Sequence, residues 1–212
     1  RPETFEYIRD ALHQRTAIRL MDNKEYLVET RLSGLARQNG LTSVDDLVDQ
    51  LRAPGSTVLW HEVVDAMTTN ETSFFRDITP FDVLREKVFP ALADQSHNAR
   101  QLHVWSAAAA SGQEAYSIAM LWNELRREYP LWDIDILATD ISQKMLGRGR
   151  QGSYSDLEVT RGLSEKRLAD NFYRSGDRWL VNEDLKQNVN FQYLNLINTW
   201  PTLPKMDIVF IR

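Results

Sequence analysis

The chain has 212 residues, no cysteine, a formal net charge of −5 and 42% hydrophobic residues. Its negative charge argues against nucleic acid as the main partner, and the lack of cysteine excludes disulfides, thiolate catalysis and Cys-based zinc sites. No apolar run approaches the roughly 18 residues that a membrane span needs. We therefore expect a cytoplasmic protein that does not insert into membranes. We also expect no metal site, because the histidines are scattered: His13, His61, His97 and His103.

Residues 1–67 are predicted to form a helical bundle. Apolar residues recur at helical spacing from Phe5 onwards, and Asn39-Gly40 is a signal for a helix end. Ser43 is expected to cap a further helix, with Asp46 three residues later in a capping-box-like arrangement. Ser56 is expected to cap the fourth helix.

The segment TTNETSFFRD, Thr68–Asp77, breaks the helical pattern. On spacing alone, the pattern favours packing of Phe74 and Phe75 into a core, with Arg76 as a solvated surface charge. Pro80 then opens a helix that runs to about Leu92. Residues 68–79 are thus predicted to link the helical bundle to a second domain, residues 80–212.

The second domain is predicted to be α/β, because strands and helices alternate from Gln101 onwards. We expect strands at 102–107, 134–139, 189–194 and 207–211, and helices at 113–127 and 142–150. In such a parallel sheet the carboxyl ends of the strands share the edge where ligands bind. Between about 151 and 193 we expect a small antiparallel excursion, in which Arg178–Val181 pairs with Val189–Tyr193.

The stretch LHVWSAAAASGQE, Leu102–Glu114, reads as a strand, a loop of small residues and a helix start. Its one loop glycine, Gly112, makes a poor cradle for a pyrophosphate, which is typically bound by G-x-G-x-x-G. The loop suits a nucleoside ligand without phosphates, and S-adenosyl-L-methionine is the expected cofactor. Glu114 lies in the first helical turn, where it could hold the α-ammonium of a methionine moiety or simply stabilise the helix dipole.

Two polar residues follow neighbouring strands at the same predicted edge. Asp140, 28 residues after Gly112, is placed to accept hydrogen bonds from ribose hydroxyls. Its other interpretation is helix capping, by Asp140 itself or by Ser142. Asn195 could bond an adenine edge or cap a turn, and the sequence leaves these alternatives open.

The combination resembles the chemotaxis receptor methyltransferases, the CheR family, over nearly the whole chain. The helical N-terminal bundle, the T-N-x-T-x-F-F-R segment, the W-S-A-A-x-x-x-G-x-E-x-Y-S segment, the strand ATDIS and the end DIVFIR stand in the family's order and spacing. The resemblance implies a Rossmann-like fold and a protein-glutamate O-methyltransferase. The implied substrate is a glutamate side chain on the cytoplasmic helices of methyl-accepting chemoreceptors, and the implied product of the cofactor is S-adenosyl-L-homocysteine.

The resemblance also implies site residues. Arg76 matches a cofactor-contact position, and we expect it to act in catalysis by orienting a carboxylate, because a guanidinium pairs carboxylates in fixed geometry. The implied cofactor contacts, to which the loop glycine is added, are Asn70, Thr72, Arg76, Gly112, Glu114, Asp140, Asn195, Leu196 and Arg212.

The chain departs from the family pattern at two places. Where the family commonly reads G-E-E-P-Y-S, this chain has Gly112-Gln113-Glu114-Ala115-Tyr116-Ser117, which keeps the implied functional glutamate. Ala109 stands where the family often has a cysteine, so that thiol is not essential. The loop Tyr173–Trp179 is shorter than in family members that need a receptor C-terminal tether. We therefore expect a monomer that acts independently of a receptor C-terminal pentapeptide.

Three rival functions differ in class. An adenosylmethionine enzyme with another substrate is disfavoured by the bundle beside T-N-x-T-x-F-F-R, and a nicotinamide oxidoreductase by the missing glycines. A non-catalytic binding module would keep the fold and lose cofactor binding. Because the family continues after the strand DIVFI, the sequence is also expected to be a piece of a longer protein, with further pocket residues beyond Arg212.

Overall fold

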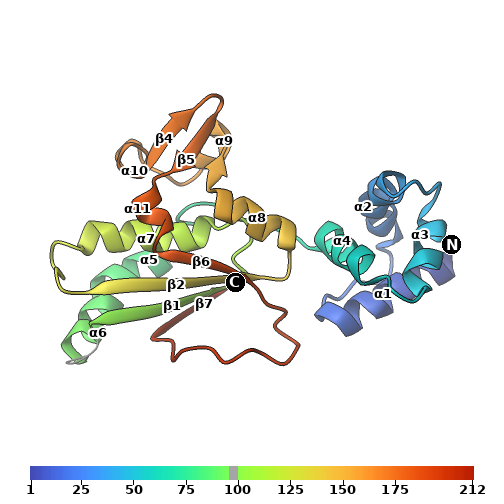
Figure 1. The fold of residues 1–212 in the computed structure, drawn as a ribbon, viewed down its shortest axis with the longest axis horizontal. Coiled ribbons are helices and arrows are strands. Elements are labelled where there is room, and N and C mark those ends of the chain that lie inside the picture. Colours follow the sequence, from blue (N-terminus) through green and yellow to red (C-terminus); the bar gives the residue numbers. More distant parts are fainter. Residues whose placement is uncertain (96–99) are drawn as a thin grey trace. The chain divides into compact units, whose positions relative to one another are not determined.

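The computed structural model describes residues 1–95 and 100–212 (Figure 1), so His97 lies outside the described residues. The chain divides into two compact units. The first unit comprises Arg1–Thr69 together with two short segments, Ile141–Gln143 and Asn195–Trp200. The second unit comprises the rest of the described chain. Within the described residues, no helix combines the length and the apolar character that crossing a membrane requires.

The first unit is helical, and its caps follow the sequence signals in part. Ser43 accepts a hydrogen bond from the amide of Asp46 at 3.1 Å, as predicted, and the Asp46 carboxylate accepts from the amide of Thr42. Ser56 precedes the fourth helix, but its hydroxyl donates to the carbonyl of Leu51 and makes no capping bond. The helices are α1 (Pro2–Thr16), α2 (Glu25–Gln38), α3 (Val44–Arg52) and α4 (Thr57–Met67).

Each of these helices buries one apolar face in a common core, as amphipathic helices do. The residues of this core that are fully shielded from solvent come from all four helices: Ile8, Leu12, Leu32, Leu47 and Val63. The predicted helical bundle is thus confirmed as a fold.

The second unit is built on a four-stranded parallel sheet with strand order β6-β2-β1-β7 (Figure 1). All four predicted strands are present within about one residue of their expected ends. They are β1 (Gln101–Ala107), β2 (Asp133–Asp140), β6 (Val189–Tyr193) and β7 (Ile208–Ile211). Because the strands are parallel, their carboxyl ends share one edge, as the sequence predicted.

Helices connect and cover the sheet. The central helix α7 is buried along most of its length, which explains why its sequence is apolar on almost every face. The helical elements of this unit are α5 (Thr79–Val83), the π-helical turn η1 (Leu84–Val88), α6 (Phe89–Gln95), α7 (Gln113–Leu125), α8 (Gln143–Gln151), α9 (Asp156–Thr160), α10 (Glu165–Asn171) and α11 (Glu183–Lys186).

A second, antiparallel sheet has the order β3-β5-β4 and stands apart from the parallel sheet (Figure 1). The predicted pairing of its central strand is wrong. Arg178–Val181 (β5) pairs with β4 (Phe172–Ser175) and β3 (Ser153–Tyr154), whereas Val189–Tyr193 is β6 of the parallel sheet. The local partner prevails because a two-residue turn, with Gly176 at a left-handed φ of 61°, closes the β4–β5 hairpin.

Candidate functional site

The loop after β1 carries three left-handed residues in five positions. Ala108, Ala110 and Gly112 have φ values of 60°, 47° and 91°. Alanine in this region is strained by roughly 1–2 kcal/mol, so the loop must be held by other contacts. One contact is the hydrogen bond from the amide of Ala109 to the carbonyl of Thr139, at 2.9 Å. The loop therefore has a defined shape despite its single glycine.

Gly112 is required by packing as well as by its backbone angle. It immediately precedes α7, and a Cβ at this position would lie 2.7 Å from Cζ of the Phe191 ring. Phe191 is itself buried in the core beneath the loop. Gly112 thus sets the close approach of α7 to strand β6.

Asp140 ends β2 and is only 5% exposed. Its Oδ2 atom accepts a hydrogen bond from the amide of Ala110 at 2.8 Å, which ties the carboxylate to the loop after β1. Helix α8 begins at Gln143, so the position that precedes the helix is Ser142. The capping interpretation of Asp140 is therefore not supported, and the carboxylate stands at the ligand edge of the sheet.

Glu114 projects from the first turn of α7 and is half-buried. Burial raises the pKa of its carboxyl, while the hydroxyl of Ser106 and the charge of Arg76 act in the opposite direction. Ser106 is fully buried in β1 and donates to Oε1 of Glu114 at 2.6 Å. Sequence reasoning missed Ser106, although a serine eight residues before Glu114 in a buried strand is an available signal.

The T-N-E-T-S-F-F-R segment places Phe74 and Phe75 in the core, as predicted from spacing. Arg76, however, is half-buried, and its guanidinium donates to the carbonyl of Glu71 at 2.9 Å. Arg76 is thus neither buried nor fully exposed, and the expectation of a solvated surface charge at this position stays a prediction.

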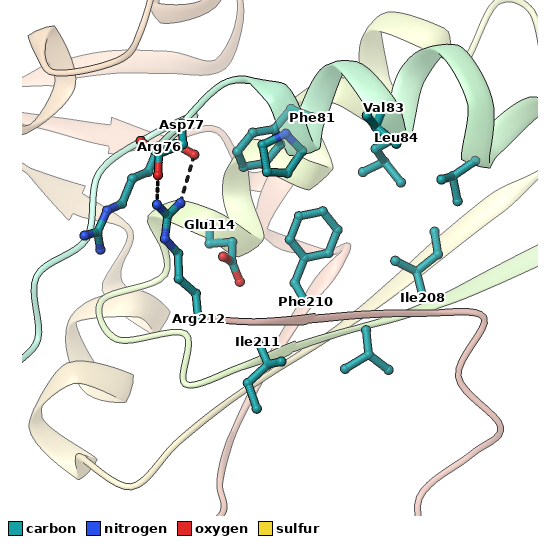
Figure 2. A pocket seen from close by; sticks show the side chains of 13 residues that line it. Arg76, Asp77, Phe81, Val83, Leu84, Glu114, Ile208, Phe210, Ile211 and Arg212 are labelled. Carbon is teal, nitrogen blue, oxygen red and sulfur yellow. Dashed lines mark hydrogen bonds and ion pairs between the residues drawn. The ribbon is translucent and has the colours of Figure 1, made fainter.

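Figure 2 shows Glu114 projecting between Arg212 and Phe210 into a pocket of about 490 Å³. The floor of the pocket is apolar, and the rings of Phe81 and Phe210 stack with their centroids 5.8 Å apart. Arg76 and Asp77 line the polar end. The pocket thus combines an apolar wall with two cationic groups and two carboxylates.

A smaller cavity of about 40 Å³ adjoins the same polar end. Four residues line both spaces: Arg76, Phe81, Glu114 and Arg212. The smaller cavity is completed by residues of the two loops: Glu71, Thr72, Ser73, Ala108 and Ala109. Arg212 fixes the Arg76 segment by donating to the carbonyl of Arg76 at 3.2 Å and by pairing with Asp77. Four predicted site residues, Thr72, Arg76, Glu114 and Arg212, therefore converge.

The remaining predicted residues differ in their placement. Asn70 is half-buried in the second unit, two residues before Thr72, and is not part of either pocket wall. Asn195 and Leu196 belong to the first unit. The side-chain Nδ2 of Asn195 donates to the carbonyl of Arg15 at 2.6 Å, and its Oδ1 accepts from the backbone amide of Ile197. The Leu196 carbonyl accepts from the indole of Trp200.

These groups match the chemistry of S-adenosyl-L-methionine. Glu114 offers a carboxylate for an ammonium, and Asp140 offers one for a ribose diol. Arg76 offers a guanidinium for a carboxylate. The loop after β1 turns its backbone toward the same edge without requiring phosphate contacts. The residues present thus fit this cofactor.

The raised pKa of Glu114 leads to a prediction about stability. Because the pKa is raised in the folded state, the carboxyl stabilises the fold fully below its unfolded-state pKa and loses that contribution as pH rises through the folded-state pKa. Glu114→Gln should therefore be more stable than wild type at neutral pH, and the difference should vanish near pH 4. Urea unfolding between pH 4 and 8 measures this. Ser106→Ala removes a hydrogen bond that lowers the pKa of Glu114. It should therefore extend to higher pH the range over which the protonated carboxyl stabilises the fold. A wild type that gains stability over Glu114→Gln with rising pH would contradict the assignment.

Comparison with known proteins identifies the family to which this chain is similar. Residues 70–212 match the family model described as "CheR methyltransferase, SAM binding domain", and residues 3–68 match "CheR methyltransferase, all-alpha domain". The chain is 42% identical over 212 residues to "Chemotaxis protein methyltransferase Cher2" of Pseudomonas putida, covering 98% of this chain and 77% of the relative. It is 43% identical over 204 residues to "Chemotaxis protein methyltransferase" of Vibrio parahaemolyticus, covering 95% of this chain and 73% of the relative.

The matches confirm the predicted family, the predicted fold class and S-adenosyl-L-methionine as the cofactor. They span nearly the whole chain in two adjoining segments. The chain therefore belongs to the CheR methyltransferase family and carries both its all-alpha domain and its S-adenosyl-L-methionine-binding domain.

Proposed function

We propose that the protein methylates glutamate side chains on the cytoplasmic helices of chemoreceptors, giving glutamate methyl esters. The observation that carries this proposal is the convergence of Arg76, Glu114 and Arg212 on a pocket with an apolar wall, in a chain of the CheR family. One end of such a pocket is suited to the charged amino-acid part of the cofactor. The apolar part is suited to methyl transfer, because the positive sulfonium and the negative carboxylate both become neutral in that step.

Methyl transfer to a glutamate carboxylate does not require general acid–base catalysis. S-adenosyl-L-methionine supplies an electrophilic methyl group when it is bound. A glutamate carboxylate, with an ordinary pKa near 4.3, is already ionised at neutral pH and needs no base. The work of the protein is therefore to bind and orient both partners and to exclude water.

We assign roles to the chain's own residues on this basis. Arg76 orients a carboxylate, either of the methyl acceptor or of the cofactor, through its planar donors. Glu114 holds the ammonium group, and Asp140 accepts from the ribose hydroxyls. Asn70, Thr72, Asn195, Leu196 and Arg212 are proposed as further cofactor contacts. Residues 1–67 form the bundle domain, residues 68–79 the linker, and residues 80–212 the cofactor-binding domain.

The test is transfer of labelled methyl groups to purified chemoreceptor cytoplasmic fragments. We expect incorporation that is released as methanol by mild base, and a mass increase of one methyl group on glutamate-containing receptor peptides. A fragment with those glutamates replaced by alanine is the matched control. Base-stable incorporation would instead favour an adenosylmethionine enzyme with another acceptor. Cofactor binding without any transfer would favour a non-catalytic module.

We further propose that the enzyme acts as a cytoplasmic monomer without a receptor C-terminal tether. The β4–β5 connection is a two-residue turn, Gly176–Asp177, between the paired residues Ser175 and Arg178. Edge strand β4 has only four residues, which limits the edge available for β-augmentation. Titration with a receptor C-terminal pentapeptide should therefore show no binding beyond that of a scrambled peptide. Micromolar binding to the authentic pentapeptide would contradict this proposal.

A further inference from the structure

The loop that carries Arg76 is held in an unfavourable backbone conformation. Phe75 and Asp77, the two neighbours of Arg76, have left-handed φ values of 46° and 51°. An aromatic side chain adopts this region rarely, so the conformation persists only where surrounding contacts over-determine it. The direction of the Arg76 side chain depends on this backbone. The contacts that hold Phe75 therefore decide where Arg76 points.

One set of contacts holds the loop from the side of α7. The amide of Phe75 donates to the hydroxyl of Ser117 at 2.9 Å, and Ser117 is fully buried. The Ser117 hydroxyl in turn donates to the carbonyl of Gln113 at 2.6 Å. Gly162 adds a backbone contact, because a Cβ there would lie 1.9 Å from the carbonyl oxygen of Phe74. The loop is thus pressed between α7 and the segment after α9.

A second contact closes over the ring of Phe75. Cζ of the Arg167 guanidinium lies 3.7 Å from the centroid of that ring, which is itself only 5% exposed. Glu124 holds the guanidinium through two hydrogen bonds, from Nε at 2.7 Å and from one terminal nitrogen at 3.2 Å. The Arg167 side chain is 20% exposed, and Glu124 also pairs with Arg85. A planar cation held through two of its three nitrogens is a rigid cover for an aromatic ring.

We propose that Arg167, held by Glu124, is a positioning residue that locks Phe75 and thereby sets the orientation of Arg76 for methyl transfer. This proposal rests on the proposed role of Arg76 at the cofactor. Arg167 does not line either of the pockets that border Arg76. It acts through the Phe75 ring and the strained backbone next to Arg76.

The test compares Arg167→Ala with Lys166→Ala, its neighbour on α10, whose side chain is 81% exposed and pairs only with Asp170 among the described residues. The first readout is hydrogen exchange of peptides that cover residues 70–77, against peptides from β1 and β2. Arg167→Ala should accelerate exchange in the loop by roughly tenfold and leave the strands unchanged. Lys166→Ala should change neither. Glu124→Gln, which keeps Arg167 and weakens its anchor, should give a smaller acceleration in the same peptides.

The second readout is calorimetric affinity for S-adenosyl-L-homocysteine and, with the receptor fragment, KM and kcat. Arg167→Ala should weaken product affinity or lower kcat by about tenfold without lowering the melting temperature by more than a few degrees. Loop exchange that is unchanged, or that accelerates equally in β1 and β2, would overturn the proposal. Faster loop exchange with wild-type product affinity and wild-type kcat would also overturn it. If wild type itself transferred no methyl groups, the proposed function would fail, and hydrogen exchange with product binding would still decide the role of Arg167.

Discussion

Asp140→Ala should weaken the binding of S-adenosyl-L-homocysteine by at least about 100-fold. The proposed loss is two hydrogen bonds from ribose hydroxyls to a charged acceptor, each worth about 1.5–3 kcal/mol. A tenfold change in affinity corresponds to about 1.4 kcal/mol. The same carboxylate also holds the amide of Ala110, so its removal frees part of a strained loop. Calorimetric titration of the product measures the effect directly.

Two variants separate ligand contact from loop support. Asp140→Asn keeps an oxygen that can accept from Ala110, and it should lose most of the affinity while retaining most of the stability. Asp133→Ala, at the exposed opposite end of the same strand, should bind product like wild type. Unchanged product affinity in Asp140→Ala would remove Asp140 from the cofactor site.

The sequence was most informative where burial repeats regularly. Strands β1 and β2 could be located because they are rich in apolar residues and are buried almost throughout. Strand β7 is a short apolar run, and in β6 apolar and polar residues alternate. Helix α7 was equally clear, since its buried residues continue around the whole helix. In these elements local propensity and tertiary burial agree, so the pattern of apolar residues is sufficient to predict where the element lies.

The site was less predictable where the backbone departs from ordinary geometry. Nothing in a run of alanines indicates that Ala108 and Ala110 are left-handed, because that conformation is imposed by the bonds to Thr139 and Asp140. The same holds for Phe75, whose strain is visible only with Ser117 and Arg167 in place. Contacts between residues distant in sequence create these features, and a single sequence does not display them.

One segment and one residue show the limits of predicting pairing and function around a strand end. The sequence of Val189–Tyr193 was compatible with a place in the parallel sheet and with pairing to Arg178–Val181, and only the first is observed. The short β4–β5 turn favours pairing of β5 with β4 instead. Asn195 does follow a strand end, yet its amide bonds to the carbonyl of Arg15. Its proposed contact with adenine stays a prediction. An amide has several bonding positions, so one protein contact does not decide which other partners it takes.

Arg76→Ala should lower kcat/KM for methyl transfer by at least about 100-fold and leave the fold intact. The proposed loss is a planar, two-donor contact with a carboxylate, for which each charge-assisted bond contributes about 1.5–3 kcal/mol. Stability should change little, because the side chain is half-buried and its described hydrogen bond goes to the carbonyl of Glu71 within the same loop. Initial rates with the receptor fragment and a thermal melt measure the two effects separately.

The matched control is Arg161→Ala, which removes an exposed arginine paired with Glu71 at 3.1 Å. It deletes the same charge beside the same loop but none of the pocket lining, so its turnover should stay close to that of wild type. Arg76→Lys should recover only part of the activity, since an ammonium keeps the charge without the planar pair of donors. Arg76→Ala should also raise the pKa of Glu114, because the charge of Arg76 opposes the effect of burial on that carboxyl. Wild-type turnover in Arg76→Ala would make Arg76 a surface charge beside the pocket, and the orientation of the reacting carboxylate would then have to come from another group.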